Sequence, residues 1–313
     1  MISSIDCLQT SCRNVLGALA SIVLSFSYHT SWENAITPQI DQTLPQLAAS
    51  HYLNSAPLIW SFIHGPRKAA ATLIDAVPAL CADLLETGEV EGALVPVIEY
   101  QRIPEILVVP GVCVGSRRSV RSVVLVTKVN DLRDVRSVAL DESSRTSAAL
   151  MKILFLEFLG IEPKWVTTAP DVERMLIEND AALVIGDPAM TFSRKDLRIF
   201  DMASLWRDYT GLGFVFAVWA VRAGDLEKFR NIDFAAARDE GLEKIEEIVS
   251  HYQKEIPLSR AELKEYLTDN ISFQIDERME DGLKLYFELA WKHGLIPQLK
   301  PLQFLEPSLP VKP

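Results

Sequence analysis

The fold is decided by the stretch Asp141-Glu142-Ser143-Ser144-Arg145-Thr146-Ser147, which joins a strand pattern to a helix pattern. Residues 135–140, directly before it, have the pattern of a strand. After it, apolar residues at positions 150, 153, 154 and 158 follow the spacing of one face of a helix. The sequence therefore predicts a strand, a polar loop and a helix in this order, which is the repeating unit of α/β proteins.

This polar loop also places many hydrogen-bond donors where the helix begins. Helix N-termini leave backbone N–H groups unpaired and carry positive partial charge, so they bind carboxylate and phosphate groups. Ser144, Thr146 and Ser147 add hydroxyl donors. Arg145 can clamp a carboxylate with two parallel hydrogen bonds. The loop therefore predicts a socket for a small anion, whereas the simpler interpretation is that Ser143 or Ser144 only caps the helix.

The composition bounds the class of protein. The chain has 313 residues, 49% hydrophobic and 23% charged, which suits a globular protein of two domains or lobes. Its formal net charge of −11 argues against nucleic-acid binding, because that needs a basic surface, although one local socket for an anion remains compatible. The four cysteines form no CxxC pair and no cluster with histidine, so we expect no metal site and a reducing, cytoplasmic location.

Residues 1–45 differ from the rest of the chain and are interpreted as an N-terminal extension. The apolar run at 15–26 is too short to span a bilayer comfortably, so we expect no stable membrane insertion. It has the length of the apolar region of a signal peptide, but Asp6 precedes it and no good cleavage site follows closely. The alternatives are a signal, a disordered tail or the product of an early start codon.

A second unit of the same kind lies near the start of the globular part. Residues 47–53 have a strand pattern. Asn54 and Ser55 stand just before Pro57, which is typical of the first turn of a helix. This unit therefore also predicts polar side chains at the start of a helix.

Two acidic residues follow buried strand patterns. Glu99 comes after residues 92–96, and Asp187 comes after residues 181–185. Open α/β sheets place ligand-facing residues at such strand ends. Asp187 is equally well explained as a turn residue before a proline. Both residues are therefore candidates for the site.

The remaining pattern continues the alternation of strands and helices. It predicts strands at 92–96, 106–116, 119–127, 163–167, 181–185 and 213–222, and helices at 77–88, 171–178, 202–208, 234–252, 260–267 and 279–293. Strands that alternate with helices predict parallel sheets. No G-x-G-x-x-G, Walker or G-x-S-x-G motif occurs, which excludes the common nucleotide-binding and hydrolase interpretations.

Five stretches resemble, in the same order, the menaquinone-biosynthesis family that contains chorismate dehydratase. They are Tyr52-Leu53-Asn54-Ser55-Ala56-Pro57-Leu58, residues 92–100, Ser144-Arg145-Thr146-Ser147, residues 183–187 and residues 210–219. Each is weak alone, but the set is specific and covers residues 46–295. Two positions depart from the family pattern, because Val97 stands in place of the usual serine and Gly213 in place of the usual proline.

The resemblance implies a fold similar to type II periplasmic binding proteins, an α/β fold with two lobes and a ligand cleft between them. It implies that residues 46–129 and 222–313 form lobe one and that residues 134–221 form lobe two. The chain would cross between the lobes near 128–133 and again within 210–222. Asn54 would then face the loop around Ser144 across the cleft.

The resemblance also implies a reaction, the dehydration of chorismate to 3-[(1-carboxyvinyl)oxy]benzoate, which is the first step of the futalosine route to menaquinone. No cofactor and no metal are implied, and the oligomeric state is left open. Chorismate carries two carboxylates, which two facing helix starts can hold. The implied catalytic candidates are Asn54, Ser116 and Glu99, and the implied substrate-binding candidates are Ser55, Ser144, Arg145, Thr146, Ser147, Asp187, Thr210, Gly211 and Phe214.

Two alternative functions remain open. A non-catalytic solute-binding protein for a small carboxylate has the same fold. The sister enzyme that makes 1,4-dihydroxy-6-naphthoate looks to depend on a histidine in lobe two, and this chain has none between residues 130 and 225. No strong general base is evident, so the substrate's own side-chain carboxylate could serve, with Glu99 or Asp187 as weaker candidates.

Overall fold

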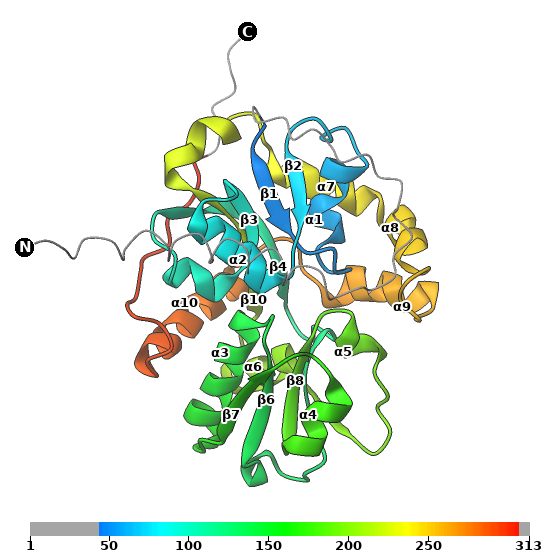
Figure 1. Ribbon diagram of the computed structural model, residues 1–313, viewed down its shortest axis with the longest axis vertical. Coiled ribbons are helices and arrows are strands. Elements are labelled where there is room, and N and C mark those ends of the chain that lie inside the picture. The colour runs from blue at the N-terminus through cyan, green and yellow to red at the C-terminus, as the bar shows by residue number, and fades with distance from the viewer. Residues whose placement is uncertain (1–43, 307–313) are drawn as a thin grey trace, which may run out of the picture. The chain divides into compact units, whose positions relative to one another are not determined.

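A computed structural model describes residues 44–306, which form two five-stranded sheets with helices packed against them (Figure 1). The N-terminal extension expected at 1–45 lies almost wholly outside the described residues. We call the first sheet with its helices lobe one and the second sheet with its helices lobe two. The expected α/β architecture is confirmed by these two sheets.

The sheet of lobe one has the strand order β2-β1-β3-β10-β4. Its strands are β1 (Gln46–Ala49), β2 (Thr72–Asp75), β3 (Gly92–Pro96), β4 (Ile106–Ser116) and β10 (Phe214–Arg222). Its helices are α1 (Ala56–Ile63), α2 (Pro78–Thr87), α7 (Phe234–Glu243), α8 (Ile245–Tyr252), α9 (Arg260–Glu265) and α10 (Glu277–Lys292). β1 runs parallel to β2 and β3, whereas β10 runs antiparallel to β3 and β4.

The sheet of lobe two has the order β7-β6-β8-β5-β9. Its strands are β5 (Val123–Thr127), β6 (Ser137–Asp141), β7 (Lys164–Thr168), β8 (Ala181–Ile185) and β9 (Arg198–Asp201). Its helices are α3 (Arg145–Ile153), α4 (Val172–Glu178), α5 (Pro188–Thr191) and α6 (Met202–Thr210). β6 runs parallel to β7 and β8, whereas β5 runs antiparallel to β8 and β9.

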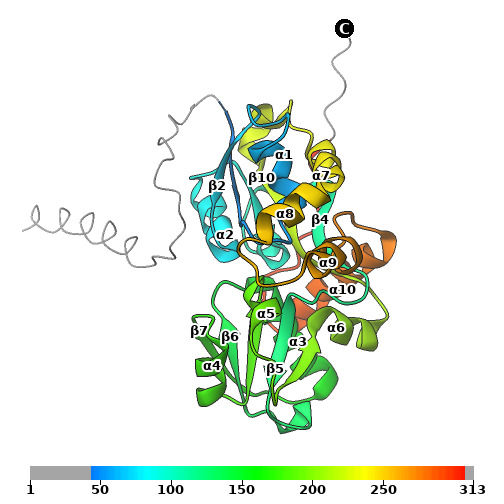
Figure 2. The same ribbon diagram turned by 90° about the vertical axis from the view of Figure 1, so that its right-hand side faces the viewer.

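The expectation of parallel sheets holds for β1, β2 and β3 and for β6, β7 and β8, whereas β10 and β5 run antiparallel to their neighbours. Residues 117–122 carry the chain from β4 into β5, and residues 211–213 carry it from α6 back into β10 (Figure 2). A strand that comes directly from the other lobe begins at the end of the sheet that faces that lobe. The parallel strands of each sheet finish at this same end with their carboxyl termini. The arriving strand therefore runs antiparallel to them, and each sheet becomes mixed.

The expected lobe boundaries also need correction. The resemblance implies that β5 belongs to lobe one, but its partners β8 and β9 belong to the second sheet. It also implies that residues 214–221 belong to lobe two, but β10 pairs with β3 and β4 of the first sheet. The chain thus crosses between Ser116 and Val123, and again between Thr210 and Phe214.

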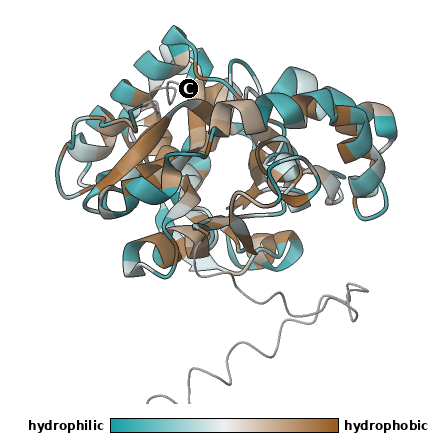
Figure 3. Ribbon diagram, turned by 90° about the horizontal axis from the view of Figure 1, so that it is seen from above, coloured by the Kyte–Doolittle hydropathy of each residue, from teal (hydrophilic) through white to brown (hydrophobic). Residues whose placement is uncertain are grey.

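The cores lie on the central strands, because every residue of β3, β5 and β8 is buried. Figure 3 shows the same arrangement, with hydrophobic colouring along the strands and hydrophilic colouring on the outward parts of the helices. Trp206 and Trp219 are fully buried. β2 and β9 are edge strands of four residues with half-buried side chains, and no strand was predicted for either.

The contact between α1 and α7 depends on a glycine. A Cβ atom at Gly241 would lie 1.9 Å from the backbone oxygen of Pro57. We therefore expect Gly241→Ala to lower the free energy of unfolding by about 1–3 kcal/mol, although alanine favours the helix more than glycine does. Gly224→Ala is the matched control, because a Cβ atom there would meet nothing within 4 Å. Denaturant titrations of both variants measure the difference, and equal stability of the two would contradict this account of the packing.

Candidate functional site

A cavity lies where the ends of β1, β3 and β8 meet the starts of α1 and α3, between residues of both lobes. The open space between its lining atoms is about 540 Å³, part of it open to solvent. The lining comes from Ser50, Tyr52, Asn54, Ser55, Pro78, Leu94, Pro96, Val114, Val123, Ser143, Ser144, Arg145, Thr146, Ser147, Ile185, Gly186, Phe216 and Ala217. Each of the five stretches that carry the family resemblance therefore contributes to one cavity.

The start of α1 forms one side of the cavity. Ser55 precedes the helix, makes no side-chain capping hydrogen bond, and is followed by Pro57, while no acidic residue lies in the first turn. The Ser55 hydroxyl lies 3.2 Å from Oδ1 of Asn54, to which it donates, and 3.1 Å from the hydroxyl of Ser50. This cluster presents polar groups of Asn54 at a helix start that carries no compensating negative charge.

The start of α3 forms another side of the cavity. Ser144 precedes the helix but makes no side-chain capping hydrogen bond, and no acidic residue lies in the first turn. The Ser143 hydroxyl instead donates to Asp141 at 2.6 Å, and the Ser143 N–H donates to the same carboxylate at 2.9 Å. Neither serine therefore caps the helix in the simple way that we considered. The two helix starts that we expected to face one ligand thus line the same cavity.

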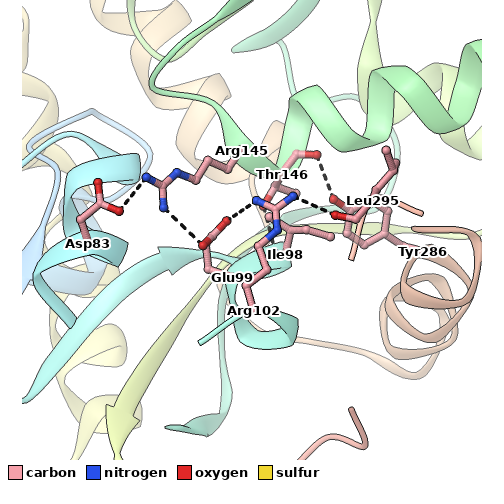
Figure 4. Close-up of polar contacts among 8 residues, drawn as sticks. All are labelled: Asp83, Ile98, Glu99, Arg102, Arg145, Thr146, Tyr286 and Leu295. Carbon is pink, nitrogen blue, oxygen red and sulfur yellow. Dashed lines mark hydrogen bonds and ion pairs between the residues drawn. The ribbon is translucent and has the colours of Figure 1, made fainter. Parts of the chain in front are cut away.

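Thr146 joins the start of α3 to lobe one (Figure 4). Its hydroxyl accepts a hydrogen bond from the Ile98 N–H at 3.3 Å, and its backbone oxygen accepts one from the Tyr286 hydroxyl at 2.9 Å. Ile98 belongs to a 3₁₀ turn after β3, and Tyr286 belongs to α10. These two bonds hold the loop in position at the cavity.

Arg145 lines the cavity but is already paired (Figure 4). Its guanidinium donates to Asp83 at 2.7 Å and to Glu99 at 3.3 Å. Burial alone would lower the pKa of Arg145, but hydrogen bonds and charges from these two carboxylates outweigh it and raise the pKa. The side chain is therefore held as a fixed positive charge in the cavity wall, rather than as a free clamp.

Glu99 is not among the residues that line the cavity. Its side chain is only 4% exposed and accepts hydrogen bonds from Arg102 at 2.6 Å and from Arg145 at 3.3 Å. A general base needs a free oxygen within reach of the substrate proton, and both oxygens of Glu99 are bound by arginines. This geometry supports a positioning role for Glu99 through Arg145.

Asp187 connects lobe two to lobe one. Both of its carboxylate oxygens accept from the Leu53 N–H at 3.3 Å. Burial raises the pKa of Asp187 to about 7, Glu255 acts in the same direction, and the Leu53 N–H acts against it. The neighbouring Gly186, with a φ of +68°, lets the ring of Tyr52 approach, because a Cβ there would lie 3.0 Å from it. Gly186 and Tyr52 line the cavity, whereas Asp187 lies beside it.

The raised pKa of Asp187 predicts a pH dependence of stability. The folded state binds the proton more tightly than the unfolded chain, whose carboxyl has a pKa of 3.8. Stability from this group is therefore present below pH 4 and is lost as pH rises to about 7. Between pH 4 and about pH 7, deprotonation of Asp187 should make the unfolding free energy of the wild type fall by about 2 kcal/mol, after allowance for solvent screening. In Asp187→Asn this contribution to the fall should be absent. Denaturant titrations at both pH values measure this decline, and an unchanged decline in the variant would contradict the prediction.

Besides Glu99 and Asp187, four further predicted site residues do not line the cavity. Ser116 is buried at the end of β4, where its hydroxyl accepts from the Arg118 N–H at 3.3 Å. The Thr210 hydroxyl donates to the Trp206 backbone oxygen at 2.7 Å, and Gly211 ends α6 with a φ of +73°. Phe214 packs edge-on against Trp206 and Tyr286. These residues lie at the crossings between the lobes.

Several lining residues were not predicted as site residues. They are Ser50, Tyr52, Pro78, Leu94, Pro96, Val114, Val123, Ser143, Ile185, Gly186, Phe216 and Ala217. The sequence signal that could have identified some of them is the family resemblance. Its stretches include Tyr52, Pro96, Ile185 and Gly186. Val114 and Val123 are apolar strand residues outside these stretches, and their sequence pattern does not distinguish a cavity wall from a core.

The described chain shows neither a metal cluster nor a membrane span. Within residues 44–306, no three or more histidine, cysteine, aspartate or glutamate side chains gather closely enough to hold a metal ion. No helix in this part combines the length and the apolar character that crossing a membrane requires.

Comparison with solved structures supports the two-lobed fold. A protein from Archaeoglobus fulgidus matches with a TM-score of 0.65 at 18% identity, covering 82% of this chain and 100% of that one. A Candida albicans gene product, described as having the generic periplasmic binding protein fold, matches with a TM-score of 0.57 at 15% identity, covering 82% and 92%. The aliphatic sulphonate binding protein of Escherichia coli matches with a TM-score of 0.55 at 15% identity, covering 86% and 96%. The expected periplasmic-binding-protein fold is confirmed.

Comparison of sequences is more specific. A Thermus thermophilus protein named chorismate dehydratase is 30% identical over 261 residues, which are 77% of this chain and 93% of that protein. The model of a family described as menaquinone biosynthesis matches residues 45–292. This range holds all five stretches of the resemblance and every residue that lines the cavity. The protein is therefore a member of the menaquinone-biosynthesis family.

Proposed function

We propose that this enzyme of the menaquinone-biosynthesis family dehydrates chorismate to 3-[(1-carboxyvinyl)oxy]benzoate, as the first step of the futalosine route. The name of the Thermus thermophilus relative supports the reaction. The observation that carries the proposal is that two helix starts, both without an acidic residue in the first turn, line one cavity. Such a site suits a small molecule with two carboxylates. The cytoplasmic location expected from the cysteines is part of the same proposal.

The start of α3 is the proposed binding site for the ring carboxylate. Its first-turn N–H groups and the hydroxyls of Ser144, Thr146 and Ser147 are the donors, because the Thr146 hydroxyl accepts from Ile98 and keeps its own proton to donate. The guanidinium of Arg145 adds a fixed positive charge nearby. Because it keeps Asp83 and Glu99 as partners, its contribution is electrostatic rather than a bidentate clamp.

The start of α1 is the proposed binding site for the rest of the substrate. Asn54 would orient the ring hydroxyl that leaves, and its side-chain oxygen accepts from Ser55, whose hydroxyl also lies against that of Ser50. A side-chain amide can donate to the departing oxygen and accept from its proton. The apolar wall formed by Leu94, Val114 and Phe216 would lie against the ring.

The reaction removes one ring proton and expels the 4-hydroxyl group, so that one water leaves and the ring becomes aromatic. The ring carboxylate shares the negative charge that develops when the proton is lost. Donors placed around this carboxylate therefore stabilise the transition state more than the ground state. Aromatisation makes the overall reaction favourable, so the protein has to supply orientation and charge stabilisation rather than a strong acid.

The substrate's own enolpyruvyl carboxylate is the proposed base. The protein offers two alternative bases, and neither of them lines the cavity. Glu99 is hydrogen-bonded to two arginines, and Asp187 is hydrogen-bonded to the Leu53 N–H. The enolpyruvyl carboxylate belongs to the same molecule as the ring proton, so no protein group is needed to bring it close. This intramolecular placement gives the carboxylate a high effective concentration.

Incubation of the purified protein with chorismate, followed by chromatography with mass detection, tests the proposal. We expect catalytic formation of a product that has lost one water. Tight binding of chorismate with no conversion would instead support a non-catalytic solute-binding protein. A parallel incubation with the cyclic futalosine precursor tests the sister reaction, and naphthoate formation from it would overturn the assignment.

A further inference from the structure

A second cavity lies at the two crossings between the lobes, and the open space between its lining atoms is about 560 Å³, part of it open to solvent. Its charged lining consists of four arginines, Arg117, Arg118, Arg207 and Arg278, with Asp276 as the acidic member. It shares no lining residue with the cavity described above. This concentration of positive charge is unusual in a chain with a formal net charge of −11.

The four arginines come from three separate segments. Arg117 and Arg118 follow β4 on the first crossing, Arg207 lies in α6, and Arg278 lies in the first turn of α10. The backbone at Gly211 and Gly213 completes the wall on the second crossing. A Cβ atom at Gly213 would lie 2.6 Å from Cγ of Met279, so the chain stays free of a side chain here. The topology thus brings cations from distant parts of the sequence to one space.

Only part of this positive charge is compensated within the described residues. Nε of Arg117 donates to Asp276 at 2.5 Å, and Asp276 also accepts from the Met279 N–H at 2.9 Å. Arg278 donates to the backbone oxygen of Gly211 at 2.7 Å, which is a neutral partner. Across residues 44–306, neither Arg118 nor Arg207 forms a salt bridge with a carboxylate. Four arginines and one carboxylate residue therefore line this cavity.

We propose that this cavity binds a small anion that carries phosphoryl groups, such as a phosphate monoester or a diphosphate. Guanidinium groups pair with oxyanions through parallel charge-assisted hydrogen bonds. A carboxylate has two oxygens in one plane, and one arginine can bind both of them with two parallel hydrogen bonds. A phosphoryl group has three outer oxygens that point in different directions, which suits arginines arriving from three segments. This site is independent of the proposed chorismate chemistry.

Isothermal titration of the full-length protein, with inorganic pyrophosphate, inorganic phosphate and citrate as probes, tests the site. We expect saturable binding of one pyrophosphate per chain, weaker binding of phosphate, and the weakest binding of citrate. Arg118→Gln and Arg207→Gln should each weaken pyrophosphate binding by about tenfold or more, since each removes one charge-assisted pair. Arg174→Gln is the charge-matched control, because Arg174 lies exposed on α4 away from both cavities, and it should bind as the wild type does.

Three outcomes would overturn the proposal. The first is the absence of saturable pyrophosphate binding to the wild type. The second is citrate binding as tight as pyrophosphate binding, because it would remove the argument for a phosphoryl group. The third is pyrophosphate binding that is lost in Arg145→Ala but kept in both glutamine variants, because the anion would then occupy the first cavity. Arg118 and Arg207 are exposed, so both glutamine variants should fold, which circular dichroism checks. If only one of them folds, its pyrophosphate affinity still tests the site.

Discussion

Asn54→Ala should lower kcat for chorismate dehydration by about 100- to 1000-fold, the usual effect of removing one donor that acts on the transition state. Asn54 lines the cavity at the start of α1, and its side chain is held by the Ser55 hydroxyl. If it acts only when the ring hydroxyl departs, kcat and kcat/KM should fall by the same factor. Steady-state kinetics on the purified variant measure both constants.

The control for this variant is Asn130→Ala, which removes an amide of the same size from an exposed bend outside the cavity lining. It should turn over at the wild-type rate. Both variants should unfold close to the wild-type temperature, because Asn54 is half-buried and faces the cavity. An Asn54→Ala enzyme with wild-type kcat would remove Asn54 from the catalytic candidates.

Glu99→Gln should act on stability rather than on chemistry. Glu99 is almost fully buried between Arg102 and Arg145, so the variant leaves two guanidinium groups facing a neutral amide. Removing one partner of a buried pair costs several kcal/mol. Because both arginines keep some exposure, we expect a loss of about 2 kcal/mol in the free energy of unfolding. Turnover per folded molecule should fall by less than about tenfold, through the shifted position of Arg145.

Glu227→Gln provides the matched control, since Glu227 pairs with Arg230 on the exposed surface. Such a pair contributes little, so its stability should hardly change. The general-base interpretation makes the opposite prediction for Glu99. A loss of about 100-fold in kcat, with an unchanged free energy of unfolding, would show that the carboxylate acts on the substrate.

The helix starts could be predicted from sequence because their signals are local. The polar residues around Asn54 and around Ser144 stand directly before apolar helical patterns, and both groups line the same cavity. The meeting of these two loops came from the family resemblance. The strand patterns alone do not determine which sheet a strand joins.

The partners of the site residues could not be predicted, because they depend on the topology. Arg145 pairs with Asp83 and Glu99, which are 62 and 46 positions away in the sequence. Partners this far away in the sequence cannot be recognised from the polar loop itself. The loop alone therefore predicts an unpaired Arg145 that is free to bind a carboxylate of a ligand. The lobe boundaries were missed for the same reason, since an apolar run such as β5 fits either sheet equally well. The edge strands β2 and β9 were missed because four half-buried residues give no apolar run.

The rate of conversion of chorismate by the wild type, compared with Asn54→Ala and Ser144→Ala, tests the account most directly. Chromatography of timed samples measures both the loss of chorismate and the appearance of 3-[(1-carboxyvinyl)oxy]benzoate. We expect many turnovers by the wild type, a large loss in Asn54→Ala, and a smaller loss in Ser144→Ala, because the N–H groups of α3 remain. Recovery of unchanged chorismate from a folded wild-type protein that binds it would contradict the account.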